Sequence, residues 1–110
     1  MEVIWSRLAK ETLVSIVKYV EDGFGHTVAL NVYNKINSHI DSLVFFPRIG
    51  MKDDAFSTAK IEVRYIINTP NIIHYGIIEN TIIIISVCDT RRSPDTIGLL
   101  VKEFMEHYNI

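Results

Sequence analysis

Basic side chains at the ends of apolar stretches are the residues of this sequence whose positions could support chemistry. Arg91 and Arg92 follow the apolar run IIIISVCD after a single residue, Thr90, and Ser93-Pro94 after them is a typical helix start. Backbone N–H groups at a helix start favour bound anions. The two arginines therefore either form an anion or carboxylate site, or end a solvated strand and pair with nearby aspartates.

A second cation, Arg64, lies inside the apolar segment EVRYII. A cation in such a segment must reach an anion, a carbonyl or water. Glu62 lies two residues away on the same face of a strand, so a structural ion pair and a ligand contact both remain open. Lys52 and Lys60, in the polar segment MKDDAFSTAK, are further candidates for target contacts.

Residue patterns for metal or nucleotide chemistry are missing from the sequence. The four histidines share no metal-ligand spacing with the single cysteine, and there is no Gly-rich phosphate loop, GxSxG or GxGxxG motif. We expect His74 to pack in the core and Cys88 to be a buried thiol on the opposite face. The sequence therefore predicts no metal site and no cofactor.

Length and composition favour one ordinary globular domain over residues 1–110, with 48% hydrophobic and 22% charged residues. A formal net charge of -2 gives no overall attraction to nucleic acid or to an anionic membrane. One cysteine cannot form an internal disulfide, and the N-terminal MEVIWSRLAKE lacks the pattern of a signal peptide. We expect a cytoplasmic protein without membrane association.

The first half of the sequence predicts a short strand and a helical hairpin. MEVIW reads as the strand, and Ser6 as the N-cap of an amphipathic helix that ends near Gly23 and Gly25. A second apolar ladder continues to FFPRIG, where Pro47 and Gly50 end it.

The second half predicts three antiparallel strands at residues 61–68, 72–78 and 81–88, joined by turns at Thr69-Pro70 and Glu79-Asn80. The turns fix a register. Its expected pairs are Ile78–Thr81, Tyr75–Ile84, His74–Ile85, Ile67–Ile72 and Arg64–Tyr75.

The face that carries Arg64, Tyr75 and Ile84 is too apolar to lie bare. A last helix from residue 94 has an apolar stripe (Ile97, Leu100, Val101, Phe104, Met105, Tyr108), and we expect it to cover this face. The predicted fold is α+β, with the order β-α-α-β-β-β-α and a helical hairpin packed on an antiparallel sheet.

This order and several segments together resemble the RelE/ParE family of bacterial type II toxin–antitoxin toxins. The segments are VIWS, FFPRIG, EVRYII, IIHYGII and IIIISVCDTRRSP, which span nearly the whole chain. The resemblance implies a toxin with a cognate antitoxin, active in growth inhibition and plasmid stabilisation. Such a chain could also form a homodimer when free.

The resemblance leaves the cellular target open. A ParE-like toxin would bind a replication target such as DNA gyrase without catalysis, through Arg64, Arg91, Arg92, Lys52 and Lys60. A RelE-like toxin would be a ribosome-dependent mRNA endonuclease, using Arg64, Tyr75, Arg91 and Arg92. A degenerate member would bind only its antitoxin.

The ParE-like function is the leading prediction. Asn71 and Thr90 stand where the ribonuclease pattern would favour arginine. The sequence therefore favours a binding protein over an enzyme.

Overall fold

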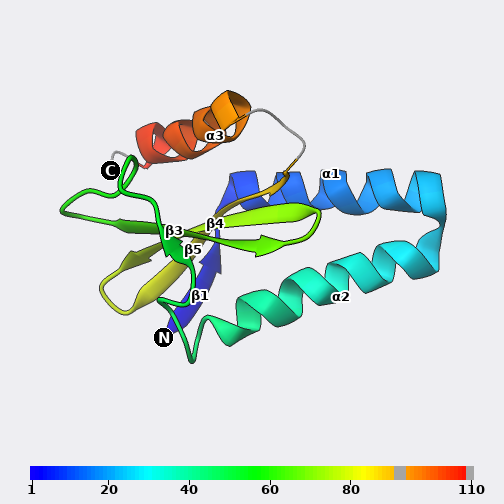
Figure 1. Ribbon diagram of the computed structural model, residues 1–110, viewed down its shortest axis with the longest axis horizontal. Helices are drawn as coiled ribbons and strands as arrows, with labels where there is room; N and C mark the ends of the chain where they lie inside the picture. Colours follow the sequence, from blue (N-terminus) through cyan, green and yellow to red (C-terminus); the bar gives the residue numbers. More distant parts are fainter. Residues whose placement is uncertain (91–93, 109–110) are drawn as a thin grey trace.

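The computed structural model describes residues 1–90 and 94–108, which form three helices and one five-stranded sheet (Figure 1). The helices are α1 (Arg7–Phe24), α2 (His26–Ser42) and α3 (Pro94–His107). The strands are β1 (Glu2–Trp5), β2 (Met51–Lys52), β3 (Glu62–Asn68), β4 (Asn71–Ile78) and β5 (Thr81–Asp89). The predicted α+β class and element order are confirmed, and the short strand β2 lies in a segment predicted to be a loop.

The sheet has the order β1-β5-β4-β3-β2, and it is mixed rather than antiparallel. Strands β3, β4 and β5 are antiparallel neighbours, as the short turns predicted. Strand β2 also pairs antiparallel with β3, which the sequence did not predict. Strand β1 pairs in parallel with β5, from Glu2 opposite Thr81 to Trp5 opposite Ile84. Turn chemistry constrains only adjacent strands, so it could not give the direction of a strand paired across most of the chain.

Local sequence explains the helical hairpin. Ser6 is the N-cap of α1, since its Oγ accepts a hydrogen bond from the Ala9 N–H at 3.0 Å and also donates to the Ile85 carbonyl at 2.9 Å. Gly25 alone separates α1 from α2, and its φ of +93° favours glycine. The N-cap residue Ser6 therefore links the start of α1 to β5 by a hydrogen bond, and Gly25 allows the chain to reverse direction between the two helices.

Helices cover both faces of the sheet. The hairpin buries one face in a core of Ala9, Leu13, Ile36, Ile40, Leu43, Ile66, Ile73, Tyr75, Ile77, Ile82, Ile84 and Val87. Helix α3 packs on the opposite face, in a core of Ile61, Val63, Ile85, Val101 and Phe104. The expectation that the last helix covers the Tyr75 face is wrong, because the hairpin already buries that face.

The register is as predicted up to an irregularity between His74 and Tyr75. The pairs Ile78–Thr81, Tyr75–Ile84, Ile67–Ile72 and Arg64–Tyr75 are confirmed. His74 pairs with Ser86 rather than Ile85, because β5 carries an extra residue there. The shift puts Ser86 and Cys88 on the His74 face, so the prediction that Cys88 and His74 lie on opposite faces is also wrong.

None of the helices formed by residues 1–90 and 94–108 is long and apolar enough to cross a membrane.

Candidate functional site

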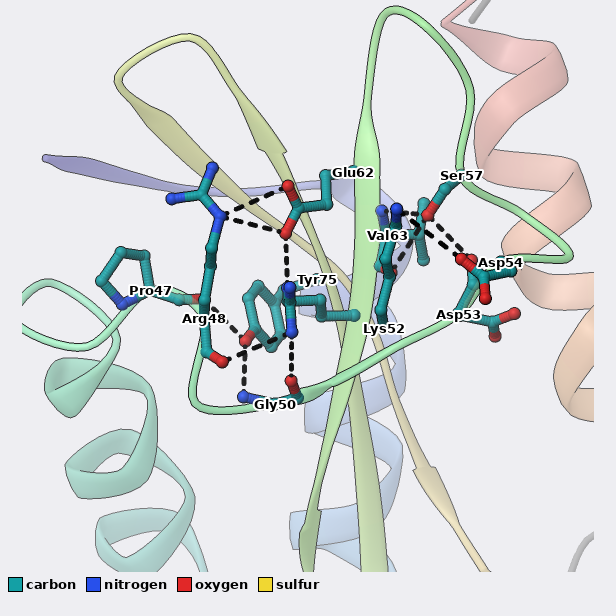
Figure 2. Close-up of polar contacts among 11 residues, drawn as sticks. Pro47, Arg48, Gly50, Lys52, Asp53, Asp54, Ser57, Glu62, Val63 and Tyr75 are labelled. Atoms are coloured by element: carbon teal, nitrogen blue, oxygen red, sulfur yellow. Dashed lines mark hydrogen bonds and ion pairs between the residues drawn. The ribbon is translucent and has the colours of Figure 1, made fainter.

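The loop between α2 and β2 is held in place by the hydroxyl of Tyr75, a residue with no solvent exposure. This hydroxyl donates to the Pro47 carbonyl at 2.8 Å and accepts from the Gly50 N–H at 3.0 Å, as Figure 2 shows. A Cβ on Gly50 would lie 2.6 Å from the Tyr75 oxygen and 2.7 Å from the Tyr65 carbonyl oxygen. Only glycine therefore fits at position 50 without displacing the tyrosine or the neighbouring strand.

Arg64, on β3, fixes the same loop. Its Nη1 donates to the Gly50 carbonyl at 2.6 Å and to the Arg48 carbonyl at 3.3 Å, and its Nε donates to the Glu62 carboxylate. The Nε of Arg48 lies 3.3 Å from the same carboxylate (Figure 2). The Arg64 side chain is 17% exposed. The structural ion pair with Glu62, one of the two sequence-based alternatives, is thus present.

Hydrogen bonding, charge and burial around this loop shift two pKa values. The hydrogen bond from Arg64, helped by the charge of Arg48, lowers the pKa of Glu62 below its ordinary value. Burial raises the pKa of the Tyr75 hydroxyl, against the opposing hydrogen bond from Gly50. Both shifts keep Glu62 charged and Tyr75 neutral near pH 7. These are the protonation states in which Arg64 and Tyr75, which we call the clamp, make the bonds that hold the loop.

Lys52 and Lys60 line one polar cavity, of about 400 Å³, at the end of the sheet. Arg48 and Glu62 line it too, next to the hydroxyl-bearing segment 57–58. Lys52 lies 3.6 Å from the Asp54 carboxylate, and both side chains are well exposed. The structure therefore brings these two predicted contact residues together, with Arg48 as a third cation.

A buried titratable pair lies on the α3 side of the sheet. The Nε2 of His74 is 3.6 Å from the Asp53 carboxylate, and the Tyr65 ring packs beside the imidazole at 5.5 Å between centroids. Burial lowers the pKa of His74, while the charge of Asp53 opposes that shift. Within the described ranges, His74 Nδ1 and the Ser86 hydroxyl have no hydrogen-bond partner.

A large groove runs along α1. Its volume is about 920 Å³, and its lining is mainly apolar, from α1, the start of α2 and the end of β5. The lining side chains include Leu8, Ile16, Tyr19, Val20, Phe24, Val32 and Val87. Tyr19 and Phe24 are more than half exposed there. A groove of this size and character suits an apolar segment of a partner.

Comparison with known proteins gives the family. The sequence model described as "ParE toxin of type II toxin-antitoxin system, parDE" matches residues 3–94. The chain belongs to the ParE toxin family. The resemblance drawn from the sequence segments is thus confirmed.

A solved structure of another ParE system shares the fold. It is described as "Chromosomal ParDE TA system from P. aeruginosa", with 18% identity and a TM-score of 0.65, and the match covers 81% of this chain and 95% of that chain. No curated protein shows a significant sequence match to this chain.

The candidate contact residues of this ParE-family chain thus divide into three groups. Arg64 and Tyr75 form the buried clamp under the loop, and Lys52 and Lys60 share the polar cavity. Arg91 and Arg92 lie outside the described residues. Among the described residues, no group of three or more His, Cys, Asp or Glu side chains could hold a metal ion.

Sequence reasoning missed two features of the site, Arg48 and the exposure of Phe45 and Phe46. It treated FFPRIG only as the end of a helix and as part of the family pattern. A usable signal was present, because turn segments are usually polar and this one carries two adjacent phenylalanines.

Proposed function

We propose that this chain is the cytoplasmic toxin of a type II toxin–antitoxin pair, and that it arrests growth by binding a replication enzyme of the DNA gyrase kind. The family match supports the toxin role. One structural observation favours binding over RNA cleavage: Arg64 and Tyr75 are engaged beneath the loop at residues 47–50. A ribonuclease would need these side chains free to reach a phosphate.

The cations that remain at the surface are the proposed target contacts. Lys52 and Lys60 flank the polar cavity, and Arg91 and Arg92 follow β5 in the sequence. Each charge-assisted contact to a carboxylate or phosphate of the target would contribute roughly 1.5 to 3 kcal/mol. Arg64 would contribute by fixing the loop that carries Arg48.

The deciding experiment is induction of the chain in a bacterium, with plasmid supercoiling and mRNA integrity followed in parallel. Loss of supercoiling with intact mRNA is the expected result. Cleaved mRNA with normal supercoiling would refute the gyrase-type target in favour of the RelE-like alternative. Normal growth without antitoxin would indicate a degenerate member.

The predicted arginine contacts are tested by Arg91→Ala combined with Arg92→Ala. We expect the double variant to lose growth arrest while it keeps its melting temperature. Unchanged toxicity at equal expression would remove both arginines from the target surface. The combination Lys52→Ala with Lys60→Ala tests the cavity residues in the same way.

We further propose that the groove along α1 receives the cognate antitoxin, through a segment that folds as it binds. The apolar lining, with Tyr19 and Phe24 exposed in the free chain, supports this assignment. Tyr19→Asp with Phe24→Asp should abolish co-purification with the product of the adjacent small open reading frame. Val14→Asp is the matched control, because Val14 is similarly exposed on α1 but does not line the groove.

A further inference from the structure

The loop after α2 presents an unusual set of exposed apolar side chains. Phe45 is 79% exposed, Phe46 63%, Ile49 59% and Met51 65%. We call these four residues the apolar knob. Four such side chains within seven residues expose more apolar surface than scattered single residues do, and concentrated apolar exposure marks interaction sites in soluble proteins.

The apolar knob is rigid, because buried groups hold the loop from beneath. Tyr75 bonds to the loop at Pro47 and Gly50, and Arg64 bonds to the carbonyls of Arg48 and Gly50. The turn itself carries backbone bonds from the Phe46 N–H to the Ser42 carbonyl, and from the Ile49 N–H to the Phe46 carbonyl. These bonds fix the backbone that carries the two phenylalanines. Fixing an exposed surface in advance reduces the entropy that binding would cost.

The size of the apolar knob indicates what kind of partner it fits. At their exposures the two phenylalanines present roughly 200 to 350 Å². Ile49 and Met51 bring the total to roughly 400 to 550 Å², against about 800 Å² per partner in a standard interface. The knob is therefore too small for a stable dimer by itself, and it has the size of the central, energetically dominant part of an interface.

The surroundings of the knob complete such an interface. Arg48 lies between Phe46 and Ile49 in the sequence, and Lys52 follows Met51. Arg48 and Lys52 also line the polar cavity. Glu62 is already engaged by Arg48 and Arg64. Phenylalanine, methionine and arginine are enriched in protein interfaces, where a few large side chains usually dominate the binding energy.

The fixed loop separates this surface from the antitoxin groove. A segment that folds on binding fits a groove, whereas exposed side chains on a loop that is already held in place suit a cleft that a folded partner already has. The residues that line the groove include none of the four knob residues. We infer that the apolar knob docks into an apolar cleft of the folded target protein, and that the groove remains available to the antitoxin. This inference rests on the proposed function and names the surface by which the target is bound.

The test replaces the centre of the knob. Phe45→Ser with Phe46→Ser should raise the toxin concentration needed to inhibit gyrase supercoiling at least about a hundredfold, and should abolish growth arrest. The melting temperature and antitoxin binding should stay unchanged. Val14→Ser with Tyr33→Ser is the matched control, since it removes exposed apolar surface from the hairpin, outside the groove and the knob.

Several results would overturn the inference. Growth arrest by the double variant at wild-type strength would show that the knob does not touch the target. Equal loss in the control pair would assign the effect to general apolar surface. Loss of antitoxin binding by the double variant would show that the knob contacts the antitoxin instead. Conversion of a wild-type dimer to a monomer would show that the knob contacts a second copy of the chain. Wild-type toxin that arrests growth without affecting supercoiling would refute the proposed target, while the growth assay would still test the knob.

Discussion

The hydrogen bonds of the Tyr75 hydroxyl give the most specific prediction about the stability of this ParE-family chain. Tyr75→Phe removes one oxygen and leaves the buried ring in place. The Pro47 carbonyl and the Gly50 N–H then lose their partner at 2.8 and 3.0 Å. Because Gly50 is buried, water cannot readily replace the lost acceptor.

The expected cost can be worked from these contacts. Each neutral hydrogen bond contributes about 1 kcal/mol net, and an unpaired buried N–H adds about 1 kcal/mol more. The sum is about 3 kcal/mol. For 110 residues the entropy of unfolding makes 1 kcal/mol equivalent to about 4 °C, so the melting temperature should fall by roughly 12 °C.

Thermal unfolding followed by circular dichroism measures this directly. Tyr65→Phe is the matched control, because its hydroxyl donates to the Met51 sulfur at 3.5 Å in an exposed position and has no other partner among the described residues. The control should change stability by less than about 0.5 kcal/mol. If Tyr75→Phe lowers the melting temperature by less than about 2 °C, the hydroxyl does not hold the loop. The argument that the apolar knob is rigid would then lose its support.

Four further predictions concern the same fold. Gly50→Ala should destabilise the protein by about 1 to 3 kcal/mol in thermal melts, whereas Gly23→Ala, with open space in α1, should stabilise it by up to about 1 kcal/mol. The lowered pKa of Glu62 gives stability that is present above about pH 4.5 and is lost at lower pH, so Glu62→Gln should flatten the acid limb of a stability–pH curve. The lowered pKa of His74 should make wild-type stability fall as pH drops below 6.5, since the unfolded chain takes up that proton first, and urea titrations of His74→Phe should lack this slope. Phe104→Ala should cost about 3 to 5 kcal/mol in urea unfolding, because its ring is buried between α3 and the sheet.

Much of this architecture could be predicted from local patterns. Apolar periodicity, the Ser6 cap and the turns after Asn68 and Ile78 gave the element order and most strand pairs. The face covered by α3 could not be predicted in this way. Both faces of the sheet are apolar, and α3 covers the face that the helical hairpin leaves open. The extra residue in β5 likewise has no local signature, since its isoleucines fit either register.

The site was less predictable, for a physical reason. Glu62 was named from the sequence as a partner of Arg64, and it is one. The other partners of Arg64 are the backbone carbonyls of Arg48 and Gly50, which carry no sequence signal. Phe45 and Phe46 have the composition of core residues, and only three-dimensional packing leaves them exposed.

The pairing of β1 with β5 has a consequence for how the chain is made. A ribosome that adds about 5 to 20 residues per second needs roughly 4 to 17 seconds to extend the chain from Trp5 to Asp89. During that time β1 has been synthesised but its pairing partner β5 is not yet complete. Nascent chains stalled before Thr81 should therefore remain sensitive to protease. Until β5 is made, the apolar face of the α1–α2 hairpin lacks the strand that supplies Ile82, Ile84 and Val87 to its core. The sheet, and with it the buried face of the hairpin, is therefore complete only after β5 has been synthesised.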